Sequence, residues 1–307
     1  MKILLTGAAG QLGTELYPRL AEIGEVLAVD LAPSLAEASN YRQLDLADAG
    51  ALETLLNRMD PDLVVNAAAY TAVDKAEEET QLAFLINAKA PGRIARWAKN
   101  NDCSILHYST DYVFDGHAER PYKEGDEPSP LNIYGESKLA GELAIQASGC
   151  EHLIIRTSWV YSAHGSNFVL SMLRLARQQL QLSVVDDQVG CPTWARNLAR
   201  ASCHLIRSGL EPNTVGPGGI YHYCDADVSS WFDFAQLVFG NAVNMGLLES
   251  APEMKRVSTG EFLQLATRPA YSVLDSRGIR QTGFEPRSLA DSLYECMKEL
   301  DSDESRR

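Results

Sequence analysis

The chain has 307 residues, of which 45% are hydrophobic, and a formal net charge of −14. This length and composition allow one large domain or two smaller ones, each with a full core. Because the chain is acidic and contains no Lys/Arg-rich run, we expect neither nucleic acid nor an anionic membrane as a partner.

Short apolar runs alternate with helical patterns through the first 160 residues. We expect strands at 2–6, 25–30, 41–46, 62–69, 104–110 and 152–161, and helices at 11–23, 51–59 and near 79–100. The strands carry few charges and many β-branched side chains, which is typical of strands buried on both faces. The pattern predicts a Rossmann-type α/β fold, in which helices cover both faces of a doubly wound parallel sheet.

The remainder of the chain has a looser rhythm. Helical patterns at 167–179 and 195–208 flank an expected strand at 182–186, and a loop rich in Gly, Pro and Asn at 211–219 is a boundary candidate. We therefore expect two domains. The Rossmann domain takes residues 1–161 and about 182–216, and a smaller C-terminal α/β domain takes about 162–181 and 217–307.

A glycine-rich stretch, TGAAGQLG at 6–13, follows the first strand and opens the first helix. Its spacing is GxxGxxG, which permits a tight turn and brings the backbone and a helix N-terminus close to a pyrophosphate. The sequence thus predicts a dinucleotide held by Gly7, Gly10, Gln11, Leu12 and Gly13.

The ends of the next strands point to the same crevice. Asp30 ends the second strand, where an acid can bind the adenosine ribose and repel a 2′-phosphate; this favours NADH over NADPH. An adenine can lie beside the end of the third strand, and small residues at the end of the fourth let a cofactor approach. The residues concerned are Asp45, Leu46, Ala67, Ala68 and Ala69. The alanines are equally consistent with tight helix–sheet packing.

The stretch YGESK at 134–138 places Tyr134 one helical turn before Lys138, after a Pro-rich loop that should delay the helix to about Ile133. An ammonium beside a phenol is expected to lower the phenol's pKa and to prepare it for proton transfer. Thr110 ends the fifth strand and can meet Tyr134 over a bound nicotinamide. The alternative is a chance pair on a surface helix.

A TGxxGxxG loop with a downstream hydroxyl residue and YxxxK is similar to the extended short-chain dehydrogenases/reductases. Within them, the sequence resembles the dTDP-4-dehydrorhamnose reductase family over nearly the whole chain. The resemblance rests on stretches at 6–13, 64–77, 107–116, 129–142, 156–162, 186–193 and 267–275.

This resemblance implies an activity and a set of site residues. The C4 ketone of dTDP-4-dehydro-6-deoxy-L-mannose would take a hydride from NADH or NADPH and a proton from Tyr134, with Thr110 orienting the carbonyl. Lys138 would also hold the nicotinamide ribose. The resemblance places Asp111, Tyr112, Trp159 and Arg268 at the dTDP-sugar site. Trp159 is alternatively a core residue, because its strand is apolar.

Three further expectations concern metals, rival functions and location. Some family members dimerise through a magnesium ion held by acidic side chains; Glu15 matches one such ligand, but residues 192–199 contain no acid, which weighs against Mg²⁺. Both a monomer and a homodimer remain open. The rivals are another sugar-nucleotide reductase or epimerase, and a non-catalytic subunit similar to the methionine adenosyltransferase β-subunit. Cysteine spacing and the absence of a signal-like or membrane-spanning run predict a cytoplasmic protein.

Overall fold

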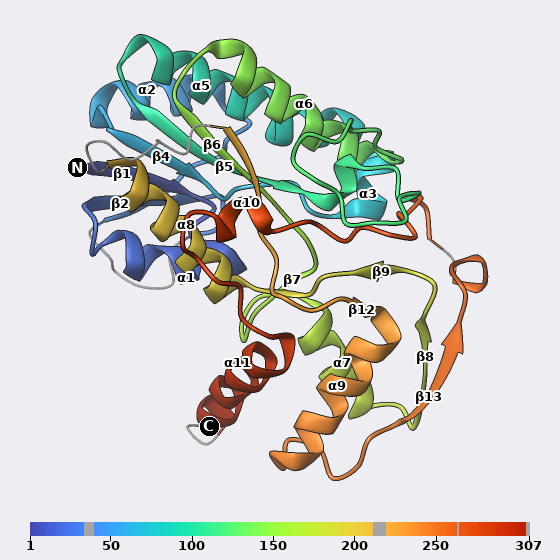
Figure 1. Ribbon diagram of the computed structural model, residues 1–307. Helices are drawn as coiled ribbons and strands as arrows, with labels where there is room; N and C mark the ends of the chain where they lie inside the picture. The colour runs from blue at the N-terminus through green and yellow to red at the C-terminus, as the bar shows by residue number, and fades with distance from the viewer. Residues whose placement is uncertain (34–39, 211–218, 263, 305–307) are drawn as a thin grey trace.

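A parallel sheet organises the first part of the computed structural model, which describes residues 1–33, 40–210, 219–262 and 264–304. Among these residues, a seven-stranded sheet runs in the order β11-β6-β5-β4-β1-β2-β3 (Figure 1). Its strands are β1 (Lys2–Thr6), β2 (Glu25–Asp30), β3 (Tyr41–Gln43), β4 (Leu63–Asn66), β5 (Ser104–Thr110), β6 (His152–Thr157) and β11 (Gly219–His222). Every neighbouring pair is parallel. The strand order reverses between β1 and β4, so the expected Rossmann-type fold is confirmed.

Helices cover both faces of this sheet (Figure 1). On one face, α1 (Gln11–Leu20) and α8 (Ala195–Leu210) pack together and bury apolar side chains against the strands. On the other face, α2 (Ala49–Met59), α5 (Ala90–Asn100) and α6 (Ile133–Ser148) do the same. Apolar side chains are buried at consecutive positions along β1, β4 and β5, which explains why these strands read as continuous apolar runs.

The helical stretch expected near 79–100 is interrupted. Its segments are α3 (Val73–Glu78), α4 (Thr80–Phe84), the π-helix η1 (Leu85–Lys89) and α5. Asn87 in the π-helix donates to the carbonyl of Tyr70 and to the hydroxyl of Ser137, and its own carbonyl packs against Gly141 of α6. These contacts with α6 account for the local widening of the helix, and such π-helical turns often lie at functional sites.

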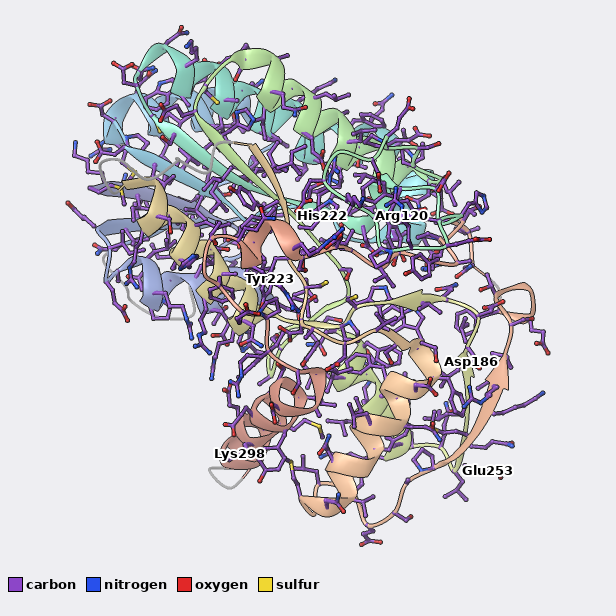
Figure 2. All side chains as sticks on the ribbon, viewed as in Figure 1. Arg120, Asp186, His222, Tyr223, Glu253 and Lys298 are labelled. Atoms are coloured by element: carbon purple, nitrogen blue, oxygen red, sulfur yellow. The ribbon has the colours of Figure 1, made fainter. Side chains whose placement is uncertain are left out.

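A second lobe lies below the sheet in Figure 1. It contains α7 (Phe168–Ala176), α9 (Trp231–Asn244), α11 (Leu289–Glu304), β8 (Gln181–Val185) and β13 (Glu253–Val257), with an apolar core of its own. Asp186 follows the end of β8, and Glu253 is the first residue of β13. Figure 2 shows both residues at the edge of this lobe. His222 and Tyr223 lie at the junction with the sheet.

Two strands do not lie in the lobe to which we assigned them from the sequence. The strand predicted at 182–186 is β8, which pairs with β13 of the second lobe and not with the Rossmann sheet. Conversely, β11 lies in the segment that we gave to the C-terminal domain, yet it pairs with β6 at the edge of the main sheet. Strand pairing is a long-range contact that local patterns do not specify. The loop at 211–218 lies outside the described residues.

The strand expected at 152–161 is broken. It forms β6 and the short β7 (Val160–Tyr161), because Trp159 has a φ of +46° that an extended strand does not allow. β7 pairs with β10 (Thr193–Trp194), and β9 (Val189–Gly190) pairs with β12 (Ser229–Ser230). The remaining short helices are η2 (Asp111–Val113), η3 (Thr259–Glu261) and α10 (Arg277–Arg280). No helix in the described ranges has the length and apolar character needed to cross a membrane.

Candidate active site

The glycine-rich loop lies between β1 and α1, and two of its glycines are required by close backbone contacts. Gly7 has a φ of +71°, and a Cβ there would lie 2.5 Å from the main-chain nitrogen of Ala68. A Cβ on Gly13 would lie 2.0 Å from the carbonyl oxygen of Gly7. The N-cap of α1 is Gly10, which provides no capping side chain. The first-turn amides of α1 therefore have no capping partner and can receive a phosphate.

The side chains at the start of α1 face the protein. The amide oxygen of Gln11 accepts hydrogen bonds from Ser162 and Asn167, and Leu12 packs against the core. A contact between these two residues and a cofactor would therefore use their main chain.

Asp30 is fixed beside this loop at the end of β2. Its carboxylate accepts hydrogen bonds from the amides of Ala9 (2.9 Å) and Ala32 (3.1 Å). At the end of the neighbouring strand, Asp45 is exposed, whereas the side chain of Leu46 is buried in the core under α2. Only the main chain of Leu46 is available for the adenine contact that we expected.

The alanines after β4 are half-buried against the loop. The main chain of Ala67 and Ala68 packs directly on Gly7, and the amide of Ala67 donates to Thr6. Ala69 is half-buried as well. Small side chains here leave the glycine loop close to the end of β4, so the packing interpretation and a cofactor contact are compatible.

Thr110 and Tyr134 meet at the carboxyl end of β5. α6 begins at Ile133, as the prolines predicted, and its N-cap Asn132 accepts a hydrogen bond from the amide of Gly135 (2.8 Å). This start places Tyr134 in the first turn. Burial raises the pKa of Tyr134 to about 12, although a hydrogen bond with Thr110 opposes the shift. The two hydroxyls thus lie close together, as the sequence predicted.

Lys138 does not act on Tyr134 in the way that we expected. Its ammonium donates to the carbonyl oxygen of Tyr108 (2.6 Å) and lies 3.5 Å from Nε2 of His107. Burial lowers the pKa of Lys138 to about 8. Since the pKa of Tyr134 is raised, the prediction that Lys138 lowers it is wrong: the ammonium is held by the strand and not by the phenol.

Three of the four expected substrate residues, Asp111, Tyr112 and Arg268, lie next to Thr110 and Tyr134. Asp111 is buried and accepts a hydrogen bond from the hydroxyl of Thr110 (2.9 Å). The ring of Tyr112 meets the ring of Tyr134 edge-on, with 5.7 Å between centroids. Arg268 forms an ion pair with Asp74 (2.6 Å) and also lies close to Tyr112. Residues 110–112, 134 and 268, far apart in the chain, therefore form one polar surface.

The chain is similar in sequence and fold to known proteins over nearly its whole length. The family model described as the RmlD substrate binding domain matches residues 1–302. A dTDP-4-dehydrorhamnose reductase of Salmonella typhimurium is 43% identical over 276 residues, which are 90% of each chain. The chain belongs to the dTDP-4-dehydrorhamnose reductase family. A solved member from Clostridium acetobutylicum is 36% identical, with a TM-score of 0.86, over 98% of this chain and 100% of that one. Another member, from Bacillus anthracis, was solved in complex with NADP; it is 33% identical, with a TM-score of 0.86, over 97% of this chain and 99% of that one.

Sequence reasoning missed a buried polar chain behind Lys138 in this family member. The hydroxyl of Thr6 donates to Asn66 (2.6 Å), and the amide of Asn66 lies 2.9 Å from Nδ1 of His107, whose Nε2 faces Lys138. Burial, together with the nearby ammonium, holds the pKa of His107 well below its usual range, so the imidazole is neutral. The available signal was the occurrence of polar residues, at 66 and 107, inside otherwise apolar strands.

Trp159 has an aromatic partner that we did not anticipate. Its ring stacks on Trp231 from α9, with centroids 3.5 Å apart and planes within 4°. Gly190 also packs on the indole, since a Cβ there would lie 2.6 Å from it. Trp159 is half-buried. Trp231 therefore occupies one face of the ring and Gly190 packs against the indole as well, so stacking of a sugar or base on Trp159 stays a prediction.

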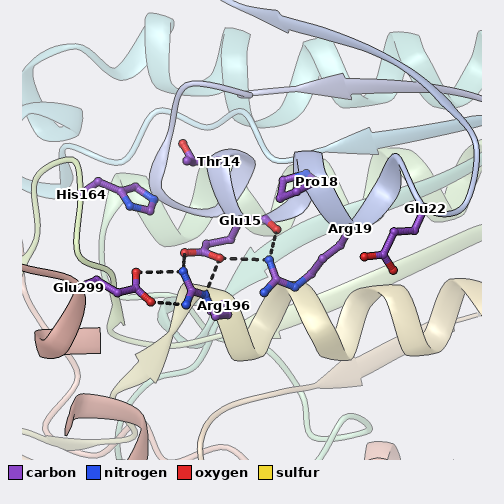
Figure 3. Close-up of a pocket in the computed structure, with 8 residues that line it drawn as sticks. All are labelled: Thr14, Glu15, Pro18, Arg19, Glu22, His164, Arg196 and Glu299. Atoms are coloured by element: carbon purple, nitrogen blue, oxygen red, sulfur yellow. Dashed lines mark hydrogen bonds and ion pairs between the residues drawn. The ribbon is translucent and has the colours of Figure 1, made fainter. Parts of the chain in front are cut away.

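Glu15, which the sequence suggested as a possible magnesium ligand, is engaged by cations (Figure 3). Glu15 accepts from the guanidiniums of Arg196 (2.9 and 3.0 Å) and Arg19 (3.1 Å), and Arg196 also binds Glu299. Arg196 lies in the segment where we found no matching acid. These side chains do not fit a metal, because a guanidinium takes up the carboxylate oxygens that an ion would need. No group of three potential metal ligands occurs within the described ranges.

Proposed function

We propose that this protein reduces the C4 ketone of dTDP-4-dehydro-6-deoxy-L-mannose to dTDP-L-rhamnose. The observation that carries the proposal is membership of the dTDP-4-dehydrorhamnose reductase family together with Thr110, Tyr134 and Lys138 grouped at the end of β5. The carboxyl ends of parallel strands are where ligands bind in this kind of sheet. Family membership indicates that the substrate is a dTDP-sugar, and we propose that it binds at this edge of the sheet.

The residues present fit a nicotinamide dinucleotide. The Gly7 and Gly13 contacts leave no space for side chains, α1 opens without a capping side chain, and Asp30 lies beside the loop. The cofactor, when bound, supplies the hydride. We propose NADH or NADPH: the Asp30 carboxylate disfavours a 2′-phosphate, whereas the Bacillus anthracis relative was solved with NADP.

The roles of the side chains follow from their positions. Tyr134 donates its proton to the carbonyl oxygen as the alcohol forms, and Thr110 orients that oxygen by hydrogen bonding. The high pKa of Tyr134 keeps its proton in place until the reacting oxygen becomes more basic. In this proposal Lys138, whose ammonium donates to the carbonyl of Tyr108, also holds the nicotinamide ribose.

Arg268 is our candidate for the diphosphate of the sugar nucleotide. Its planar fork suits phosphate oxygens, and it lies close to Tyr112 next to the reacting pair. The chain carries a net charge of −14, so a cation is needed locally to offset repulsion of the substrate. In this arrangement the phosphate competes with Asp74 for the guanidinium.

We also propose that one lobe binds the dinucleotide and the other binds the sugar nucleotide. The dinucleotide domain comprises residues 1–161 and about 195–222, and the remaining segments form the sugar-nucleotide domain. We place the reaction in the cytoplasm, with the protein as a monomer or homodimer. All six cysteines are buried and free, which is consistent with a reducing compartment.

One assay tests the function. Purified protein is mixed with the dTDP-4-keto sugar and either NADH or NADPH, and the loss of reduced-nicotinamide absorbance is followed together with formation of dTDP-L-rhamnose. A sugar-nucleotide epimerase would produce no net loss of absorbance. A non-catalytic subunit would bind the cofactor without any turnover. Either of these results would reject the proposal.

A further inference from the structure

We propose that Asp111 is a positioning residue that, as a neutral carboxylic acid, directs the hydroxyl proton of Thr110 towards the reacting oxygen. The inference rests on the proposed reductase function and assigns Asp111 a task in addition to contact with the sugar. The protonation state of Asp111 decides whether the Thr110 hydroxyl can donate to the substrate carbonyl.

The argument begins with the single proton of the Thr110 hydroxyl. Its oxygen lies 3.2 Å from the amide nitrogen of Tyr112 and 2.9 Å from Oδ1 of Asp111. An amide N–H only donates, so Thr110 accepts from Tyr112. An ionised carboxylate only accepts, so Thr110 must then give its proton to Asp111. In that state no proton remains with which Thr110 could orient a substrate carbonyl or bind the phenol of Tyr134.

Protonation of Asp111 reverses this direction. A carboxylic acid donates its own proton to the Thr110 oxygen and leaves the Thr110 proton free. The hydroxyl of Tyr134 is close enough to Thr110 to interact with it. The neutral acid therefore permits the chain Asp111 to Thr110 to the reacting oxygen, whereas the carboxylate draws the Thr110 proton away.

The surroundings of Asp111 favour the neutral form. The residue is 2% exposed, and its Oδ2 is buried and makes no hydrogen bond of good geometry with a described residue, although the Ser272 hydroxyl lies nearby. Such burial is costly for a charge. The groups that face it are Thr110 and Tyr112 from its own segment, Tyr134 from α6, Cys191 and Ser272, and none of them is a cation.

The Arg268 guanidinium acts on Tyr112, the residue after Asp111, and not on Asp111 itself. Arg268 forms its ion pair with Asp74 and reaches Tyr112, so it does not neutralise Asp111. Consistently, burial raises the pKa of Asp111 to about 6, against the opposing effect of the Ser272 and Thr110 hydroxyls. The phosphates of the proposed substrate and cofactor bring further negative charge to the crevice, which favours the neutral acid still more.

The first test compares the pH dependence of kcat in the wild type, Asp111→Asn and Asp111→Ala. Since the protonated form is the competent one, wild-type kcat should fall about tenfold per pH unit above an apparent pKa of about 6 or higher. The carboxamide that Asp111→Asn introduces cannot ionise, and its N–H donates to Thr110 at every pH. We therefore expect that variant to lose the high-pH limb and to retain at least about a tenth of the wild-type maximum.

The alanine variant and a second background complete the kinetic test. Asp111→Ala provides no donor and should lose about 100-fold in kcat without restoring activity at any pH. In a Thr110→Val background, replacing Asp111 by Asn should change kcat less than about twofold, because Asp111 acts through Thr110. A high-pH limb that persists in Asp111→Asn, or losses that multiply in the double variant, would overturn the proposal.

An infrared measurement separates this inference from the proposed function. The difference spectrum of wild type minus Asp111→Asn, recorded over a pH series, reports the carbonyl stretch of a protonated carboxyl group without any turnover. We expect that band to disappear as pH rises through about 6. A carboxylate band alone at about pH 5 would exclude the neutral acid even in an active reductase. An inactive wild type that shows the band would instead reject the reductase and keep the acid.

Discussion

The ion pair between Arg156 of β6 and Glu142 of α6 gives the most direct test of how the catalytic helix is held. The guanidinium binds the carboxylate at two points, with Nε–Oε1 at 2.9 Å and a second contact to Oε2 at 2.6 Å. Both side chains are buried, at 2% and 1% exposure. Glu142 lies on α6 two turns after Tyr134, so the pair fastens the helix that carries Tyr134 and Lys138 to the sheet.

Replacing Arg156 with Met removes the cation and leaves the Glu142 carboxylate buried without compensation. Breaking a buried pair in this way costs about 3–5 kcal/mol of unfolding free energy. For a chain of this size, each kcal/mol lowers Tm by about 2 °C, so we expect a fall of about 6–10 °C. The contact between the guanidinium and the ring of Phe114, 5.1 Å to the centroid, is lost as well. Thermal and urea unfolding, followed by circular dichroism, measure both quantities.

Two further variants identify the cause of this loss. Arg120 also binds a carboxylate, Asp126, at two points (2.8 and 3.0 Å), but it is half exposed. Surface pairs contribute little, so Arg120→Met should leave Tm nearly unchanged. The double variant Arg156→Met/Glu142→Leu should recover most of the stability, because apolar residues of similar volume replace a buried pair at little cost. A loss below about 1 kcal/mol for Arg156→Met, or no recovery in the double variant, would refute the reasoning.

Three other outcomes concern catalysis and specificity. Tyr134→Phe deletes one hydroxyl, so kcat should fall by about 10²–10⁴-fold while folding and cofactor binding persist; near-normal turnover would exclude Tyr134 as the proton donor. Asp30→Ala removes like-charge repulsion of about 1–2 kcal/mol, so the kcat/KM ratio should shift towards NADPH by roughly 5–30-fold; an unmoved ratio would place Asp30 away from the ribose. Arg268→Ala should raise KM for the dTDP-sugar roughly tenfold with little change in cofactor KM, because a charge-assisted contact contributes about 1.5–3 kcal/mol. An effect on cofactor KM instead would assign Arg268 to the other half of the site.

Local sequence pattern was enough to predict the Rossmann half of the protein and the edge of the sheet where ligands bind. Strands such as β1 and β5 are short, mostly apolar and bounded by loops, so local pattern was sufficient to locate them. The glycine spacing, the end of β5 at Thr110 and the start of α6 at Ile133 also depend on local backbone chemistry. Parallel topology then brings the strand ends to one edge, which is why Thr110 and Tyr134 could be paired in advance.

The pairing of the charged and aromatic groups could not be predicted from the sequence, because it depends on contacts between distant elements. Lys138 points to the carbonyl of Tyr108, Arg196 joins Glu15 to Glu299, and Trp159 stacks on Trp231. Each partner lies on another element, and the second lobe is held by the same kind of long-range contact, as in the pairing of β8 with β13. Residue spacing reports which side chains share an element. The pKa of a buried group depends on burial and on neighbours from other elements, and these exist only once the chain has folded.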